Sequence, residues 1–317
     1  MTTGSTTIIF DNVSKFYGET LGVNRVKLAL PPGITSLVGP NGSGKSTLMN
    51  LMTGLLFPTE GSILVRGTSP LKPESLFRQL GYCTQYDSFP PGITGWRYVF
   101  GLMLLHGHGD AWARERAEAA IELVGLTKDC RRRIGAYSKG MRQRIKLAGA
   151  IAHDPAVLIL DEPLNGLDPM ARSEIIGLMR KLAGEGKHII LSSHILHEVD
   201  IVSDQVVMLN EGYVVAEGEI RTVRQEVKAV PLQVTVRCDR PSELASMMIQ
   251  SDSIVEVRMH PDRRGLLVRT EDADRFYLAL NKAVVDHNVT VESISPADDD
   301  VQSVYQYLIN DNRGANQ

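Results

Sequence analysis

The chain has 317 residues, of which 43% are hydrophobic and 22% charged, with 34 basic against 37 acidic residues. At a soft average of roughly 150 residues per domain, this length predicts about two globular domains. The ordinary hydrophobic content excludes a disordered tail or a collagen-like rod. The formal net charge of −3 gives the molecule no overall basic field, so bulk attraction to nucleic acid is not expected.

The cysteines and the apolar segments indicate the cellular compartment in which the chain works. Cys83, Cys130 and Cys238 lie far apart in the sequence, without the spacing of a disulfide framework or a zinc site, which fits a reducing cytoplasm. The N-terminus has no basic start followed by an apolar core, so no signal peptide is expected. The longest apolar stretch, residues 98–105, is shorter than the ~20 residues that cross a bilayer. We expect a chain without a membrane span of its own.

The first part of the chain alternates between apolar strand-like segments and helical patterns. Apolar runs predict short buried strands, most of them in a largely parallel sheet, at residues 7–11, 33–38, 77–85, 157–161, 188–193 and 204–210. Apolar spacing predicts helices at residues 48–56, 96–124 and 139–153.

After about residue 228 the pattern changes to alternating strands and amphipathic helices. We expect strands at residues 232–237, 253–260, 265–270 and 289–295, with helices at 241–250 and 273–288 and a terminal helix at 301–309. The order βαββαβ is typical of a ferredoxin-like sandwich. We therefore predict a domain at 1–228 and a smaller one at 229–317.

A glycine-rich turn follows the second strand and matches the pattern GxxxxGK[ST] in full. Glycines let successive backbone N–H groups point into one cavity, and the helix that follows adds its positive end. Lys45 can reach the β- and γ-phosphates and the Ser46 hydroxyl can ligate Mg²⁺. A chance match is disfavoured because the motif lies between an apolar strand and a helix. The turn predicts a nucleoside triphosphate site formed by Gly39, Pro40, Asn41, Gly42, Ser43, Gly44, Lys45, Ser46 and Thr47.

Two adjacent carboxylates end the strand predicted at 157–161. Asp161 would hold Mg²⁺, directly or through water, and Glu162 could polarise the attacking water. The alternative is that both carboxylates merely cap the next helix.

These motifs surround a third, the segment YSKGM at residues 137–141, and in this order the chain resembles the ATPase subunits of ABC transporters over about residues 7–220. The third segment corresponds to the family's signature, usually LSGGQ. The resemblance implies an α/β fold of the P-loop NTPase type, with a mixed sheet core and a helical subdomain at about 86–150. The ferredoxin-like α+β domain would follow it as an accessory or regulatory unit.

The resemblance also implies roles by position. Gln85 lies in the Q-loop, where it would ligate Mg²⁺ with Ser46 and Asp161 and sense the γ-phosphate. His194 corresponds to the switch histidine, and residues 165–168 to the D-loop that ends at Asp168. Tyr17 stands where the family places an aromatic that stacks on adenine, although Phe16 beside it competes for this role.

The resemblance implies Mg²⁺-dependent ATP hydrolysis, with Glu162, His194, Lys45 and Gln85 as the catalytic set. The family works as a head-to-tail dimer, in which Ser138 and Gly140 of the signature would reach ATP on the other subunit. The signature departs from the family at Tyr137, Lys139 and Met141, and Trp96 stands about where many relatives carry a glutamate after the Q-loop. Lys139 would help bind phosphate or, more simply, face solvent.

A single ATPase domain without a membrane span implies a separate membrane permease, with this chain peripheral on the cytoplasmic face of the membrane. The C-terminal extension and the wording YSKGMRQR are similar to exporter ATPases for drugs, sodium, polysaccharides or metal-maturation factors. The cargo would contact the permease, and no direct nucleic-acid contact is expected. The alternative is a soluble ABC ATPase acting on nucleic acid or ribosomes, which usually carries tandem ATPase domains, a coiled-coil insertion or zinc-binding cysteines.

Overall fold

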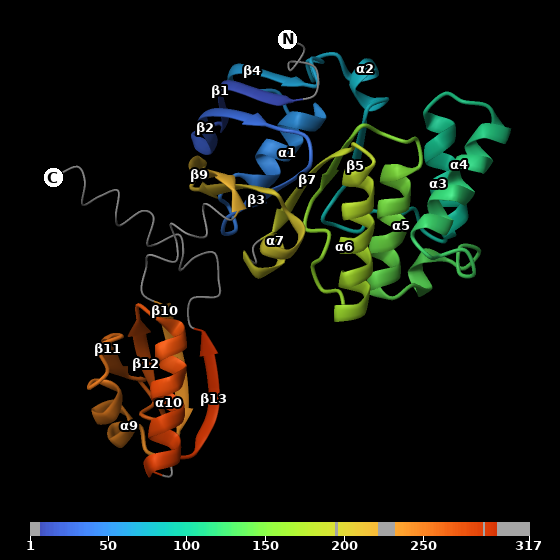
Figure 1. The fold of residues 1–317 in the computed structure, drawn as a ribbon. Helices are drawn as coiled ribbons and strands as arrows, with labels where there is room; N and C mark the ends of the chain where they lie inside the picture. Colours follow the sequence, from blue (N-terminus) through green and yellow to red (C-terminus); the bar gives the residue numbers. More distant parts are fainter. Residues whose placement is uncertain (1–6, 194–195, 221–231, 288, 297–317) are drawn as a thin grey trace. The chain divides into compact units, whose positions relative to one another are not determined.

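The computed structural model describes residues 7–193, 196–220, 232–287 and 289–296 (Figure 1). The chain divides into two compact units, with the division at Glu219 and Ile220. The predicted boundary near residue 228 lies outside the described residues.

The centre of the first unit is a six-stranded sheet in the order β5-β6-β7-β3-β8-β9. The first five strands are parallel and β9 pairs antiparallel with β8, which confirms the mixed sheet. Every residue of β3, β6 and β7 is buried, as expected for strands covered on both faces. The strands are β3 (Ile34–Val38), β5 (Leu80–Cys83), β6 (Val157–Leu160), β7 (His188–Ser193), β8 (Gln205–Asn210) and β9 (Tyr213–Glu219).

A second, three-stranded antiparallel sheet has the order β2-β1-β4, from β1 (Ile8–Tyr17), β2 (Thr20–Leu30) and β4 (Glu60–Val65). Helix α1 (Lys45–Thr53) packs between the two sheets, because Met49 shares one core cluster with Phe10 of β1 and Leu37 of β3 (Figure 1). Burial on both sides fixes the position of the turn that begins this helix.

The opposite face of the six-stranded sheet is covered by the helical part of the unit. Leu158 and Leu160 of β6 face this side, whereas Val157 and Ile159 face α1. The helices on this side are α3 (Gly95–Leu105), α4 (Asp110–Leu123), α5 (Lys139–Ile151), α6 (Pro169–Gly184) and α7 (Leu196–Val202), with a short 3-10 turn at Ile134–Ala136. Helix α2 (Pro73–Phe77) instead places Leu76 in the core cluster that contains α1. Among the described residues, no helix is both long enough and apolar enough to cross a membrane.

The prediction of one helix over residues 96–124 is wrong. Two helices, α3 and α4, are separated by residues 106–109, where Gly107 has φ 81°. A left-handed residue cannot continue an α-helix, and glycine adopts it without steric cost. The strand predicted at 77–85 is likewise shorter, because α2 ends at Phe77 and β5 covers Leu80–Cys83.

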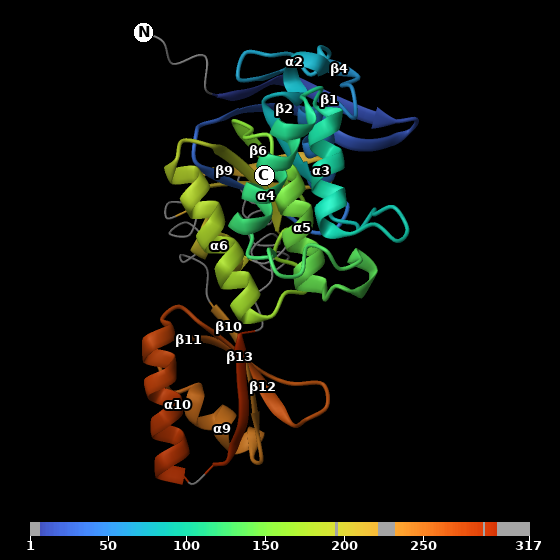
Figure 2. The same cartoon turned by 90° about the vertical axis from the view of Figure 1, so that its right-hand side faces the viewer.

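The second unit has its own four-stranded antiparallel sheet in the order β11-β12-β10-β13. Its two helices lie on one face of that sheet (Figure 2), where Phe276 is fully buried among Val236, Leu244 and Leu266. This is the predicted βαββαβ order, while the terminal helix predicted at 301–309 lies outside the described residues. The elements are β10 (Leu232–Cys238), α9 (Pro241–Met248), β11 (Ile254–Met259), β12 (Gly265–Thr270), α10 (Ala273–His287) and β13 (Val291–Pro296).

Candidate active site

The phosphate-binding turn joins β3 to α1, as its sequence predicts. Gly42 and Gly44 have left-handed backbones, with φ of 81° and 107°. A Cβ on Gly44 would also lie 2.8 Å from Val23 Cγ1, so both the conformation and the space at this position favour glycine. Gly44 is the N-cap of α1, and the turn therefore ends at the positive end of a helix.

Lys45 is buried within this turn, with 6% of its surface exposed. Its Nζ donates to the carbonyl oxygens of Gly39 at 2.6 Å and Pro40 at 2.9 Å. Burial lowers the pKa of Lys45, and the negative charges of Glu162 and Asp161 oppose that shift. The ammonium group is therefore held inside the turn that is expected to receive phosphate.

Asp161 lies at the end of β6, beside the start of α1. Its Oδ2 accepts a hydrogen bond from Ser46 Oγ at 3.2 Å, and its Oδ1 accepts one from Ser192 Oγ at 2.7 Å. The Ser192 hydroxyl in turn accepts from the backbone N–H of Glu162 at 2.7 Å. The predicted metal ligands Ser46 and Asp161 are thus neighbours, and Ser192 ties them to Glu162.

Glu162 is held by two side-chain amides. Gln85 Nε2 and Asn165 Nδ2 each donate to Glu162 Oε2 at 2.8 Å. Glu162 itself has φ 48°, a left-handed conformation that costs a non-glycine residue energy and that recurs at active sites. Helix α6 is capped instead by Asp168, whose Oδ1 accepts from Ala171 N, so the alternative that the two carboxylates cap the next helix is wrong.

Tyr17 lies at the end of β1, near the first turn of α1. Its hydroxyl is 3.3 Å from Thr47 Oγ1, and 45% of the residue is exposed. Phe16 has a comparable exposure of 40%, but its backbone N–H bonds to Thr59 Oγ1. Of the two aromatic candidates, Tyr17 is the one that contacts the phosphate-binding turn.

The signature segment begins α5, as expected. Ser138 is the N-cap, and its hydroxyl accepts from Met141 N at 3.2 Å. Lys139 has an exposed side chain that lies over Gly166 of the D-loop, where a Cβ would collide with its Nζ. Ser138 and Gly140 belong to the start of α5 and Lys45 to the start of α1, two separate helices in Figure 1.

Three site features were not predicted from the sequence. Ser192, which joins Asp161 to Glu162, and Asn165, which holds Glu162, were named only as parts of longer motifs. Lys146 of α5, which contacts the backbone of residues 84–85, carried no signal at all. The switch histidine His194 lies outside the described residues.

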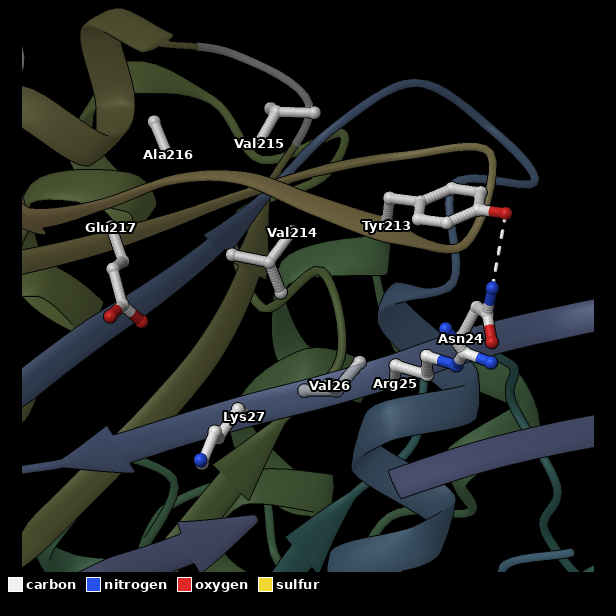
Figure 3. Close-up of a pocket in the computed structure, with 9 residues that line it drawn as sticks. All are labelled: Asn24, Arg25, Val26, Lys27, Tyr213, Val214, Val215, Ala216 and Glu217. Carbon is white, nitrogen blue, oxygen red and sulfur yellow. Dashed lines mark hydrogen bonds between the residues drawn. The ribbon is translucent and has the colours of Figure 1, made fainter. Parts of the chain in front are cut away.

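A hollow of about 670 Å³ lies between the edge strands β2 and β9 (Figure 3). At one end Asn24 Nδ2 donates to Tyr213 Oη at 3.1 Å, and Figure 3 shows Val26 and Val214 facing the space between the strands. None of the predicted site residues lines this hollow, so it is distinct from the phosphate-binding turn.

The residues of the turn fit a magnesium nucleotide. Ser43 Oγ is buried and has no hydrogen-bond partner among the described residues, so it is available to a phosphate oxygen. The Ser46 hydroxyl and the Asp161 carboxylate supply oxygen atoms of the kind that Mg²⁺ prefers.

Comparisons with known proteins agree with this geometry. The family description "ABC transporter" matches residues 23–165. The bacitracin transport ATP-binding protein BcrA of Enterococcus faecalis is 40% identical over 213 residues, which cover 66% of this chain and 68% of that protein. The daunorubicin/doxorubicin resistance ATP-binding protein DrrA of Streptomyces peucetius is 30% identical over 296 residues, or 93% of this chain and 89% of that protein.

Among solved structures, the dimeric MJ0796, a bacterial ABC transporter cassette, is similar with a TM-score of 0.63 and 26% identity, over 68% of this chain and 99% of that one. The chain belongs to the ATP-binding subunits of ABC transporters and is an ATPase of that family.

Proposed function

We propose that this chain is the ATP-hydrolysing, energy-coupling subunit of an ABC exporter. The observation that carries the hydrolytic role is the hydrogen-bonded line from Ser46 through Asp161 and Ser192 to Glu162. It holds a carboxylate beside the phosphate-binding turn. The direction of transport is supported by relatives named for bacitracin transport and for daunorubicin/doxorubicin resistance.

Binding and chemistry are divided between the two ends of this line. Lys45 and the backbone of the turn would hold the phosphates, and Ser46, Asp161 and Gln85 would hold Mg²⁺. The metal ion, when bound, neutralises phosphate charge. Glu162 accepts a proton from the attacking water or orients it, because its carboxylate is fixed by the amides of Gln85 and Asn165.

The remaining expected contacts come from a second subunit. Ser138 and Gly140 begin a 13-residue helix, whose N-terminus is suited to a γ-phosphate. In a head-to-tail dimer, each signature would close on the nucleotide of the partner, with Tyr17 against adenine and with His194 and Asp168 near the γ-phosphate. Closure would exclude water and complete the site in the ATP-bound dimer.

The subunit would drive a separate membrane permease from the cytoplasmic face of the membrane, and the permease would select the cargo. The unit at residues 229–317 is proposed as an accessory module that packs or dimerises, with a regulatory ligand site as the sharper alternative. Phe276 and its neighbours give the described part of this unit its own core.

The test is to co-express the tagged chain with the products of its neighbouring genes and identify what it retains. A multi-span membrane protein that stimulates ATP hydrolysis, with no stimulation in a Lys45→Ala variant, is the expected result. Retention of ribosomes or nucleic acid in place of a membrane protein would favour the soluble ABC ATPase and refute the transport proposal.

A further inference from the structure

Lys146 is a buried lysine on the helix that begins with the signature. Its side chain is 7% exposed. The ammonium group donates to the carbonyl oxygens of Thr84 at 3.0 Å and Gln85 at 3.1 Å, and it lies 3.2 Å from Asp87 Oδ1. The ammonium group thus makes two hydrogen bonds and one ion pair, and all three partners lie in the turn that follows β5.

Arg142 strengthens this contact from one helical turn earlier. Its Nε donates to Asp87 Oδ2 at 2.7 Å, so the Asp87 carboxylate receives two cations of the same helix. Arg142 also donates to the carbonyl oxygen of Tyr137 at 2.6 Å, at the beginning of the signature. Two side chains of α5, Lys146 and Arg142, therefore hold residues 84–87 against this helix.

The same turn reaches the catalytic carboxylate on its other side. The carbonyl of Gln85 is held by Lys146, while the Gln85 amide donates to Glu162 Oε2 at 2.8 Å. One residue thus connects the signature helix to Glu162. A shift of this backbone would move the amide away from the carboxylate.

The free-energy cost of burying the charge of Lys146 indicates that its hydrogen bonds and ion pair contribute to the structure of this turn. Only 7% of the lysine side chain is exposed to solvent. A charged amine in such surroundings is unfavourable unless it is paired and hydrogen-bonded. The three acceptors of residues 84–87 satisfy that requirement, and the contact therefore also fixes the turn.

We propose that Lys146 is a positioning residue for ATP hydrolysis, which holds residues 84–87 so that the Gln85 amide stays on Glu162. Lys146 does not touch the nucleotide in this proposal and acts through Gln85. The inference rests on the proposed role of Glu162 as base or water positioner.

The test compares Lys146→Met with Lys187→Met in the full chain. Lys187 is a matched control because its side chain is 13% exposed and its Nζ bonds one carboxylate, Asp154 at 2.5 Å, and one carbonyl, Pro155 at 2.9 Å. These bonds lie where β6 and β7 begin, at the opposite ends of the strands from Asp161. Both variants lose an ammonium group from a side chain that is no more than 13% exposed, but only Lys146→Met loosens Gln85.

For Lys146→Met we expect kcat to fall about 10-fold or more, since small displacements of a positioned group have effects of this size. The KM for ATP should stay within about twofold, because the interaction acts on the chemical step. Lys187→Met should stay near the parent in both constants. Equal losses of kcat in the two variants would overturn the proposal.

A second measurement separates positioning from a general loss of structure. In a Gln85→Ala background, Lys146→Met should lower kcat little further, since residues that act as a unit are not additive. Full additivity would show that Lys146 acts elsewhere.

Amide hydrogen exchange gives a readout that does not depend on hydrolysis. Exchange at residues 84–87 should be faster in Lys146→Met and unchanged in Lys187→Met. If the parent chain fails to hydrolyse ATP, the proposed function fails, while the exchange comparison still decides whether Lys146 holds this turn. Unchanged exchange in Lys146→Met would overturn the inference even with an active parent.

Discussion

Replacing Glu162 by glutamine separates the chemical role of this side chain from its structural one. Glu162 Oε2 accepts two hydrogen bonds of 2.8 Å, from Gln85 and Asn165. A glutamine can place its own carbonyl oxygen at the same point and keep both bonds, although it loses their charge assistance. Hydrogen bonds to charged groups contribute about 1 kcal/mol more than neutral ones, so the loss of folding stability should not exceed about 2 kcal/mol.

The rate of hydrolysis should respond far more strongly. A neutral amide cannot accept the proton of the attacking water, and general-base catalysis contributes roughly 10²- to 10⁴-fold. We therefore expect Glu162→Gln to lower kcat by about that factor and to leave ATP affinity intact. Because the nucleotide is retained, the dimer should accumulate in its closed form.

The assay combines phosphate release, ATP titration and size-exclusion chromatography with ATP present. Glu162→Ala is the control, since it leaves the amides of Gln85 and Asn165 without this acceptor and should lose more stability than the glutamine variant. Hydrolysis by Glu162→Gln at the parent rate would refute the assignment of Glu162. A large loss of ATP affinity with kcat unchanged would show that Glu162 serves binding instead.

Three further predictions follow from buried groups. Ser192→Ala removes the hydroxyl that joins Asp161 to the Glu162 backbone, so it should cost about 1–2 kcal/mol in thermal unfolding and lower kcat in the phosphate-release assay. Burial, aided by a neighbouring histidine ring, lowers the pKa of His153 to about 4, below the ordinary value near 6.5. Between these two pH values the unfolded chain binds more protons than the folded one, so the free energy of unfolding should fall by about 2 kcal/mol as the pH drops from 6.5 towards 4. Urea unfolding at pH 7 and pH 4.5 measures this fall, which should be smaller in His153→Gln than in the parent. Phe276→Ala empties a fully buried position in the second unit and should cost that unit about 3–5 kcal/mol, measured by hydrogen exchange at its amides, with the first unit unaffected.

The nucleotide turn could be predicted because its chemistry is local in the sequence. The strand, the glycines and Lys45 lie within a few residues of one another, so a short sequence pattern contains everything that the turn needs. The join between Asp161 and Ser192 could not be predicted in the same way. It depends on the register of two parallel strands, in which Leu160 pairs with Leu191, and the sequence of neither strand determines that alignment.

The missed elements have different causes. The break at residues 106–109 had a visible signal in Gly107 and Gly109, which the helical pattern on both sides outweighed. Strand β2 alternates clearly only after Arg25, a residue with φ 45°, and before it the burial pattern is irregular. Lys146 looks like an ordinary surface lysine until β5 places the turn of residues 84–87 against its helix, so this contact is a tertiary one.

Lys139, one of the residues that depart from the family signature, lies in steric contact with Gly166 of the D-loop. Its side chain lies where a Cβ on Gly166 would project, and Gly166 also has φ 66°. Any larger residue at 166 would have to displace the lysine and adopt a left-handed backbone. The side chain of Lys139 therefore packs against the D-loop of its own subunit and is still exposed to solvent. A ligand that bound the Lys139 ammonium would therefore first have to move it away from Gly166.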